Sequence, residues 1–217
     1  MLLPLSIAAV VGYLLGSLPV GYLVARAHGV DIFKAGSGNP GATNVKRVLG
    51  SKAGNLVYFL DALKGALAAG WPFAWCLVGQ RASDTGVAGV SSAYVWGILG
   101  LVAAVVGHSF SVFTHFKGGK GVATASGGLF VLLPVPVLIA AAVWVVTFFI
   151  SRYVSLASIL ATIAVPAAAW SLGKPLALEI LATVLGFLVV VRHHTNIRRL
   201  LAGTEHRWER KQPGDDQ

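Results

Sequence analysis

Six long apolar stretches constrain the fold of this chain more than any other feature, and they cover residues 2–25, 56–78, 87–106, 135–150, 156–172 and 176–191. A helix that crosses a bilayer needs roughly 20 apolar residues, so each stretch predicts a membrane span. Only 12% of the residues are charged, against about 25% in a soluble domain. The sequence therefore predicts an all-α integral membrane protein in which residues 1–217 form one domain. Residues 206–217 are expected to be a loosely ordered cytoplasmic tail.

A shorter apolar piece, residues 122–133, decides the topology. Pro134 and Pro136 follow it and favour a break in the helix. If the piece crosses separately and the N-terminus lies outside, 14 of the 17 Lys and Arg residues fall on the cytoplasmic side. Fusing it to residues 135–150 would place the basic C-terminal tail outside, against the positive-inside rule. We therefore expect a seven-transmembrane-helix bundle with a cytoplasmic C-terminus, although this short span reaches only about 18 Å.

Three polar segments rich in glycine interrupt the apolar sequence, and the seven-helix topology places all of them on the cytoplasmic side. They are residues 36–47 (GSGNPGATNVKR), 107–124 (GHSFSVFTHFKGGKGVAT) and 192–205 (RHHTNIRRLLAGTE). Glycine exposes backbone N–H groups and the cations neutralise charge, a combination that suits a phosphate-bearing ligand. The formal net charge of +9 fits anionic headgroups or phosphorylated substrates better than nucleic acid in a membrane protein.

The first two segments each allow a simpler interpretation. Residues 36–41 match the pattern GxGxxG, but a dinucleotide site needs a preceding strand and a βαβ unit, and here apolar helices flank the motif. A glycine-rich turn capped by Thr43 or Asn44 remains an alternative to a binding surface. Residues 117–121 lack the first Gly and the final Ser or Thr of a Walker A motif. Lys120 can hold an anion at the start of the next helix, or bind lipid headgroups.

The third segment begins where an apolar stretch ends. His193, Asn196 and Arg199 share one face if the helix continues, and His193 could be a general base, a phosphate donor or a capping residue. We expect Glu205 to neutralise an arginine. Two more charged residues, Asp61 and Lys64, are spaced to form a buried structural pair near the site. The six histidines show no spacing with carboxylates or cysteine that predicts a metal site.

The chain closely resembles the bacterial integral-membrane glycerol-3-phosphate acyltransferases that use acyl phosphate, the PlsY family. The resemblance rests on residues 37–44 (SGNPGATN), on residues 118–124 (GGKGVAT), and on Arg192-His193, Asn196-Ile197 and residues 203–205 (GTE). It covers nearly the whole chain. Ser111 stands where a proline is common in the family, and His194 where a basic residue is common. The resemblance implies transfer of an acyl group from acyl phosphate to glycerol 3-phosphate in the bacterial inner membrane, without a cofactor or metal.

Roles for individual residues are also implied by the resemblance. Ser37 and Arg47 are expected to act at the acyl phosphate, Lys120 at glycerol 3-phosphate, and His193 and Asn196 at the substrate hydroxyl, with the proton acceptor left open between His193 and a substrate phosphate. The residues expected to contact substrate are Gly38, Asn39, Gly41, Thr43, Asn44, Gly118, Gly119, Gly121, Ser155 and Ser158.

A carrier or binding protein for phosphorylated lipids or small anions is the alternative function, since it would use the same basic residues without chemistry. Against it, the polar residues cluster at one face and do not line a path between internal repeats. The expected partners are the two substrates and membrane lipids, with no nucleic acid. Association with other enzymes of phospholipid synthesis is a further expectation.

Overall fold

The computed structural model describes residues 2–79 and 91–208, with side chains for residues 5–75 and 91–208, and every regular element in this part of the chain is a helix. The elements in chain order are α1 (Leu2–Ser17), α2 (Val20–Ala27), α3 (Ala42–Leu49), α4 (Ser51–Gly79), α5 (Ser92–Ser109), the 3-10 turn η1 (Val112–Thr114), α6 (Val122–Leu132), α7 (Pro134–Ser151), α8 (Val154–Ser171), α9 (Leu176–Arg192) and α10 (His194–Leu201). The prediction of an all-helical fold is confirmed for the described residues.

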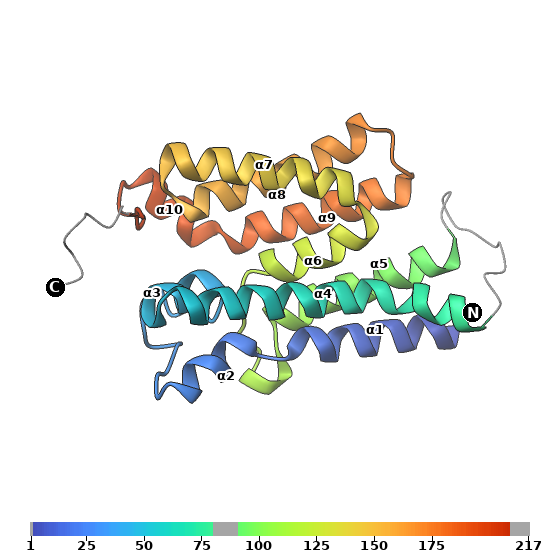
Figure 1. Cartoon of the computed structure of the whole chain (residues 1–217), viewed down its shortest axis with the longest axis horizontal. Helices are drawn as coiled ribbons and strands as arrows, with labels where there is room; N and C mark the ends of the chain where they lie inside the picture. Colours follow the sequence, from blue (N-terminus) through green and yellow to red (C-terminus); the bar gives the residue numbers. More distant parts are fainter. Residues whose placement is uncertain (1, 80–90, 209–217) are drawn as a thin grey trace.

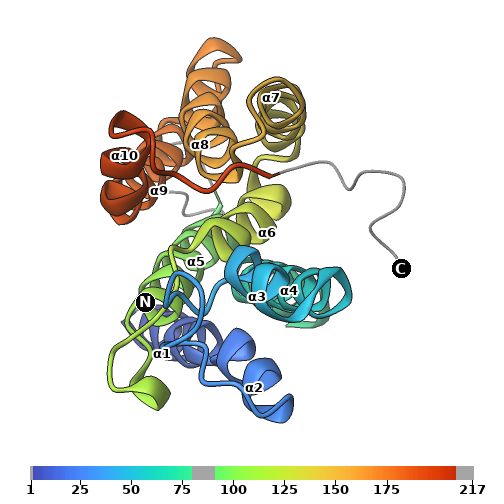
Figure 2. The same ribbon diagram turned by 90° about the vertical axis from the view of Figure 1, so that its left-hand side faces the viewer.

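The long helices run side by side along one axis (Figure 1), and the end-on view separates them into two groups (Figure 2). Helix α1 packs on α5 and α4 packs on α6 in one group, while α7, α8 and α9 form the other. The main core lies between them and is built largely by α5, α6 and α9, with Leu101, Leu132, Leu185 and Val189 almost fully buried. The short helices α2, α3 and α10 gather at one end of the bundle.

Glycines allow the helices of the first group to approach closely. A methyl group built at Gly12 would lie 2.3 Å from the carbonyl oxygen of Gly100, and one at Gly16 would lie 2.0 Å from that of Ala104. Such contacts are possible only when no side chain intervenes. In a membrane, where lipid is as apolar as leucine, close packing of small residues is a main source of helix association. The α1–α5 contact therefore follows from glycine spacing in the sequence.

Four apolar helical segments are long enough to cross a membrane within the described residues: Leu5–Ala27, Ser92–Thr114, Pro134–Ser151 and Val154–Ser171. Helices α9 and α10, bent by 58° at His193, could supply a fifth. Large apolar side chains cover the outside of the bundle, including Phe59, Phe149 and Phe187, each more than 60% exposed. Exposed apolar surface of this extent fits contact with lipid, so the protein is an integral membrane protein.

Several boundaries differ from the sequence-based expectation. The predicted first span is broken at Leu18 and Pro19, because proline has no N–H group to continue the helix. The predicted break before residue 135 is present: α6 ends at Leu132 and α7 begins at Pro134, where a missing N–H group costs nothing. The predicted start of the third span, residues 87–90, and tail residues 209–217 lie outside the described residues. Trp208, within the predicted tail, donates its main-chain N–H to the carbonyl oxygen of Arg152 at 2.9 Å.

Candidate active site

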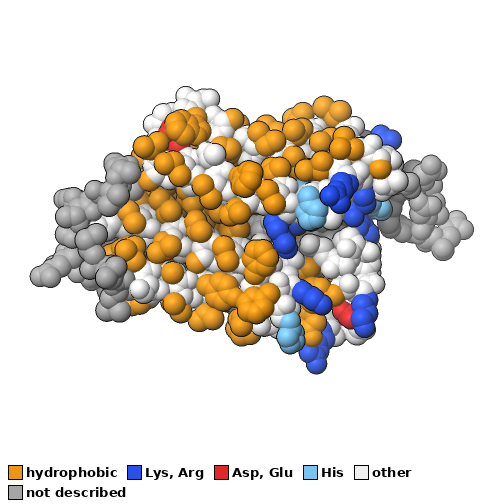
Figure 3. Space-filling model, turned by 180° about the vertical axis from the view of Figure 1, so that it is seen from behind, with side chains coloured by type: hydrophobic (Ala, Val, Ile, Leu, Met, Phe, Trp, Pro, Cys, Tyr) orange, Lys and Arg blue, Asp and Glu red, His pale blue; other side chains and the backbone are white. Residues whose placement is uncertain are grey.

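Positively charged side chains gather at the end of the bundle that carries α2, α3 and α10. Figure 3 shows Lys, Arg and His side chains concentrated toward this end, whereas apolar side chains cover most of the remaining described surface of that face. The first and third segments carry α3 and α10 at this end, and the second segment is linked to α10 by a contact between Lys120 and Asn196. A site for an anion can therefore be built there from the residues upward.

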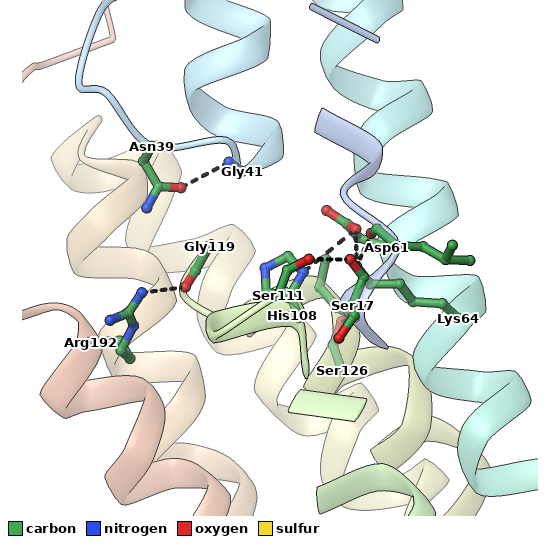
Figure 4. A network of polar contacts seen from close by, with 12 residues as sticks. Ser17, Asn39, Gly41, Asp61, Lys64, His108, Ser111, Gly119, Ser126 and Arg192 are labelled. Atoms are coloured by element: carbon green, nitrogen blue, oxygen red, sulfur yellow. Dashed lines mark hydrogen bonds and ion pairs between the residues drawn. The ribbon is translucent and has the colours of Figure 1, made fainter. Parts of the chain in front are cut away.

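Asn44 organises the first segment. Its side-chain oxygen accepts the main-chain N–H of Ser37 at 2.8 Å, and its amide nitrogen donates to the carbonyl oxygen of Ala35 at 2.9 Å. Gly36 has a φ of 58°, and a methyl group there would lie 2.3 Å from the Asn44 oxygen. Asn39 shapes the same loop by accepting the Gly41 N–H at 2.8 Å (Figure 4). The side chains of the two asparagines thus form hydrogen bonds within the loop itself, while the side chains of Ser37 and Thr43 are exposed.

The loop that precedes α6 is held by main-chain contacts on two sides. The N–H group of Gly119 donates to the carbonyl oxygen of His108 at 3.1 Å, and Nη2 of Arg192 donates to the Gly119 carbonyl oxygen at 2.9 Å (Figure 4). The expectation that glycine N–H groups are exposed for a phosphate is therefore wrong at Gly119. Gly121, with a φ of 81°, then starts α6. The arrangement leaves Lys120 between a fixed glycine and the helix N-terminus.

Lys120 joins the second segment to the third. Its ammonium group donates to Oδ1 of Asn196, whose Nδ2 donates to Oε1 of Glu205 at 2.8 Å. The other oxygen of Glu205 accepts Nε of Arg199 at 2.7 Å. Glu205 thus contacts an arginine, as its expected structural role requires. We call Arg47, Lys120, Arg192 and Arg199, with Glu205, the cationic cluster.

The pKa of Lys120 is shifted by the neighbouring charges. Burial lowers the pKa to about 8; Glu205 opposes the shift, whereas Arg199, Arg47 and Arg192 add to it. The charges of all three arginines therefore act on the ammonium group. Arg47 belongs to the first segment, and the structure therefore brings cations of all three segments together.

Glu205 is the carboxylate of the cationic cluster and stays ionised. Burial by itself would raise its pKa, but hydrogen bonds from Arg199 and Asn196, together with the nearby Ser155 hydroxyl, outweigh that effect and lower it. Its negative charge compensates only part of the positive charge around it. The cluster keeps an excess of positive charge suited to an anionic ligand.

His193 is buried and lies within the electrostatic influence of Lys120 and Glu205 of the cationic cluster. Nδ1 lies 2.7 Å from the carbonyl oxygen of Val189, so this nitrogen carries the proton and Nε2 keeps a free lone pair. Burial, followed by repulsion from Lys120, lowers the pKa of His193 to about 4, although the Val189 contact and Glu205 oppose the shift. The side chain is therefore a neutral hydrogen-bond acceptor at physiological pH.

The two serines of α8 are placed differently. Ser155 is buried beside Glu205 and contributes to the lowering of its pKa. Ser158 accepts the indole N–H of Trp144 on α7 at 3.2 Å. The structure thus associates Ser155 with the cationic cluster and turns Ser158 toward a neighbouring helix.

Asp61 and Lys64 form the expected pair, with Nζ of Lys64 2.8 Å from Oδ1 of Asp61. Lys64 also donates to the carbonyl oxygen of Leu18 at 3.0 Å, at the break between α1 and α2. Sequence reasoning missed His108, whose Nδ1 lies 3.6 Å from Asp61. It also named Arg192 and Arg199 without giving them a role at the substrates, although both belong to the third segment.

No group of three or more His, Cys, Asp and Glu side chains that could hold a metal ion occurs in the part of the chain that the structure describes. What the described residues offer instead is a cluster of cations at one end of an apolar helical bundle. The fold and the site together define an integral membrane protein built to handle anionic ligands.

Comparison with known proteins narrows this class to a family. The model of the glycerol-3-phosphate acyltransferase family matches residues 6–203. A glycerol-3-phosphate acyltransferase of Aquifex aeolicus is 46% identical over 90% of this chain and 95% of its own length, and one from Allorhizobium ampelinum is 41% identical over 93% and 90%. The crystal structure of PlsY (YgiH), an integral membrane glycerol 3-phosphate acyltransferase, in its glycerol 3-phosphate form superposes with a TM-score of 0.82 at 42% identity, covering 94% of this chain and 96% of that one. The chain belongs to the glycerol-3-phosphate acyltransferase family and is an acyltransferase.

Proposed function

We propose that the protein transfers a fatty acyl group from acyl phosphate to the sn-1 hydroxyl of glycerol 3-phosphate, giving lysophosphatidic acid and inorganic phosphate. This would be the first acylation step of phospholipid synthesis. Family membership supports the proposal, as do the crystal structures of PlsY in a glycerol 3-phosphate form and a lysophosphatidic acid form. The observation that carries it is the meeting of Arg47, Lys120, Arg192 and Arg199 in one cluster, because both substrates bear phosphate groups.

The reaction needs two anions side by side and little covalent help from the protein. The hydroxyl oxygen bonds to the acyl carbon, the bond from that carbon to the phosphate oxygen breaks, and the hydroxyl proton passes to an acceptor. Acyl phosphate already carries a good leaving group, so catalysis consists mainly of positioning and charge stabilisation. In this proposal Arg47 and Ser37 bind the acyl phosphate, and Lys120 with Asn196 binds glycerol 3-phosphate.

The lowered pKa of His193 bears on the proton acceptor that the sequence leaves open. A group with a pKa of about 4 is a weaker base than a phosphate oxygen, whose second pKa is about 6. We therefore assign the proton to a substrate phosphate. His193 would accept a hydrogen bond through Nε2 from the other hydroxyl of glycerol 3-phosphate and so orient the substrate, leaving the proton of the sn-1 hydroxyl for the phosphate.

The seven-helix topology is part of the same proposal. Helices α1, α4, α5, α6, α7, α8 and α9 would each cross the bacterial inner membrane, with the N-terminus outside and the cationic cluster in the cytoplasm. The excess of Lys and Arg at that end supports it through the positive-inside rule. Helix α6, with 11 residues, spans only about 17 Å and would be enclosed by its neighbours. Residues 1–217 would form one domain, since the cluster draws on elements from both groups of helices.

Phosphate release from the purified, detergent-solubilised protein tests the function. Release should require both acyl phosphate and glycerol 3-phosphate, and lysophosphatidic acid should form in equal amount. An Arg47→Ala variant should lose most of the activity, while Lys34→Ala, which changes an exposed lysine, should keep it. Binding of both compounds without turnover would contradict the proposal and favour a carrier.

A further inference from the structure

The loop that carries Lys120 is anchored to α5 at His108. The main-chain oxygen of His108 accepts the Gly119 N–H at 3.1 Å, and its ring covers the same glycine. A methyl group built at Gly119 would lie only 2.2 Å from Nε2 of His108. The direction in which Lys120 leaves the loop therefore depends on where the His108 ring sits.

The ring is fixed from behind by a buried carboxylate. Nδ1 of His108 faces Oδ1 of Asp61 at 3.6 Å, and Asp61 is held in turn by Lys64 at 2.8 Å (Figure 4). The side chains of Asp61, Lys64 and His108 are 2%, 5% and 9% exposed, so none can relax into solvent. A continuous line of contacts leads from Lys64 to the residue next to Lys120.

Stability alone is a weak reason for such a network. A buried ion pair costs desolvation energy, and well-packed apolar residues of similar volume often serve as well or better. The network ends at one specific place, against Gly119, the residue that precedes Lys120. Asp61, Lys64 and His108 also line one cavity together with Gly118 and Gly119.

We propose that Asp61 and His108 are positioning residues for glycerol 3-phosphate: Asp61 fixes the His108 ring, and the ring fixes the Gly118–Lys120 loop. The inference rests on the proposed function, in which Lys120 binds that substrate. The proposal links Asp61 and His108 to glycerol 3-phosphate alone, because the proposed site binds the acyl phosphate through Arg47, which lies on α3.

Steady-state kinetics of Asp61→Asn and His108→Phe test the assignment. Each change roughly keeps the shape of the side chain: Asp61→Asn removes the negative charge that faces the His108 ring, and His108→Phe removes the ring nitrogen that faces Asp61. The KM for glycerol 3-phosphate should rise on the order of tenfold, less than the roughly 100-fold effect of misplacing a reacting group by 1 Å. The KM for acyl phosphate should change by less than about twofold. Asp31→Asn, which alters an exposed pair with Lys34 at the same i,i+3 spacing, should change neither.

A double-mutant cycle separates contact from general destabilisation. Gly119→Ala alone should raise the KM for glycerol 3-phosphate because the new methyl group displaces the His108 ring. In a His108→Ala background the methyl group has room, so adding Gly119→Ala should have little further effect. Equal factors in both backgrounds would show that the two residues act independently and would overturn the inference. An equal rise in both KM values, or a lower folded fraction with unchanged KM, would overturn it as well.

Lys120→Ala, measured in parallel, tells the two failures apart. If it raises the KM for glycerol 3-phosphate and the Asp61 and His108 variants do not, only the positioning role is wrong. If Lys120→Ala has no effect on that KM, or the unmodified protein forms no lysophosphatidic acid, the proposed site or function fails and the positioning role fails with it.

Discussion

The protein buries charge in two regions, and it balances that charge in opposite ways. Around Asp61 a carboxylate and an ammonium group neutralise one another inside the bundle, with the His108 ring beside them. In the cationic cluster Glu205 contacts Arg199 directly and Lys120 through Asn196, and it is one carboxylate among four cations. Neighbouring charges of one sign are costly unless a ligand compensates them. The comparison indicates that the first region holds neighbouring elements in position, whereas the second carries the excess positive charge that suits anionic substrates.

Removing one charged partner should lower the free energy of unfolding more in the Asp61 region, where the charges are balanced, than in the cationic cluster. Lys64→Met leaves Asp61 without its closest cation and should lower the free energy of unfolding by about 3–5 kcal/mol. Arg199→Met also removes one partner of an ion pair, but this arginine is 39% exposed, and the loss should stay below about 1 kcal/mol. Denaturant unfolding in detergent measures both. Equal losses would erase the distinction between the regions.

Catalytic activity, in contrast, should depend most on the cationic cluster. Lys120→Ala removes a buried cation that faces substrate in the proposed mechanism, and kcat/KM should fall by about 100-fold or more. Lys117→Ala is the matched control, since Lys117 lies on the same loop but is exposed. Phosphate release at varied glycerol 3-phosphate concentration gives both values. Similar losses for the two lysines would mean that the loop acts through overall charge and not through the position of Lys120.

Proton binding offers a finer test of the cationic cluster. Below its pKa of about 8, Lys120 is protonated and can bind a phosphate without further cost. As the pH rises above that value the free enzyme loses this proton, so the KM for glycerol 3-phosphate should increase by up to about tenfold per pH unit. Glu205→Gln removes a charge that raises the pKa of Lys120 and should move the increase to lower pH.

His193 should give no inflection between pH 7 and 5, because its pKa lies at about 4. A pH profile of kcat for the His193→Gln variant provides the comparison. If the unmodified protein loses activity with a midpoint near 6 and the variant does not, His193 is the proton acceptor and the assignment to a substrate phosphate is wrong.

The smallest effect concerns the two serines of α8. Ser155→Ala removes a hydroxyl beside Glu205 and should lower kcat/KM several-fold, about the value of one neutral hydrogen bond of roughly 1 kcal/mol. Ser158→Ala breaks only the contact with Trp144 and should change kcat/KM by less than about twofold. Measuring kcat/KM of the two variants in parallel tests this difference. A larger loss of kcat/KM for Ser158→Ala would indicate that Ser158 contacts substrate.

Local chemistry explains which features could be predicted from the sequence. The apolar stretches, the break at Pro134 and the Asp61–Lys64 pair depend on residues close together in the chain. The role of His108 was not predictable, because a ring on α5 meets Gly119 only after α4, α5 and the loop have packed. The same holds for Gly119, whose N–H group looks free in the sequence but bonds to His108. The break at Pro19 was visible as a proline, yet the apolar residues around it favoured one continuous span.

The main-chain hydrogen bond from Trp208 to Arg152 connects the C-terminal stretch to the end of α7 at the polar end of the bundle. Figure 2 shows the red C-terminal stretch passing over that end after α10. Nζ of Lys46 on α3 lies 5.3 Å from the centre of the Trp208 ring, while Arg152 follows α7. Trp208 therefore contacts both groups of helices, α7 through Arg152 and α3 through Lys46, at the end of the bundle that carries the cationic cluster. A chain that ends before Trp208 would lack these two contacts but would still contain every residue of the cationic cluster.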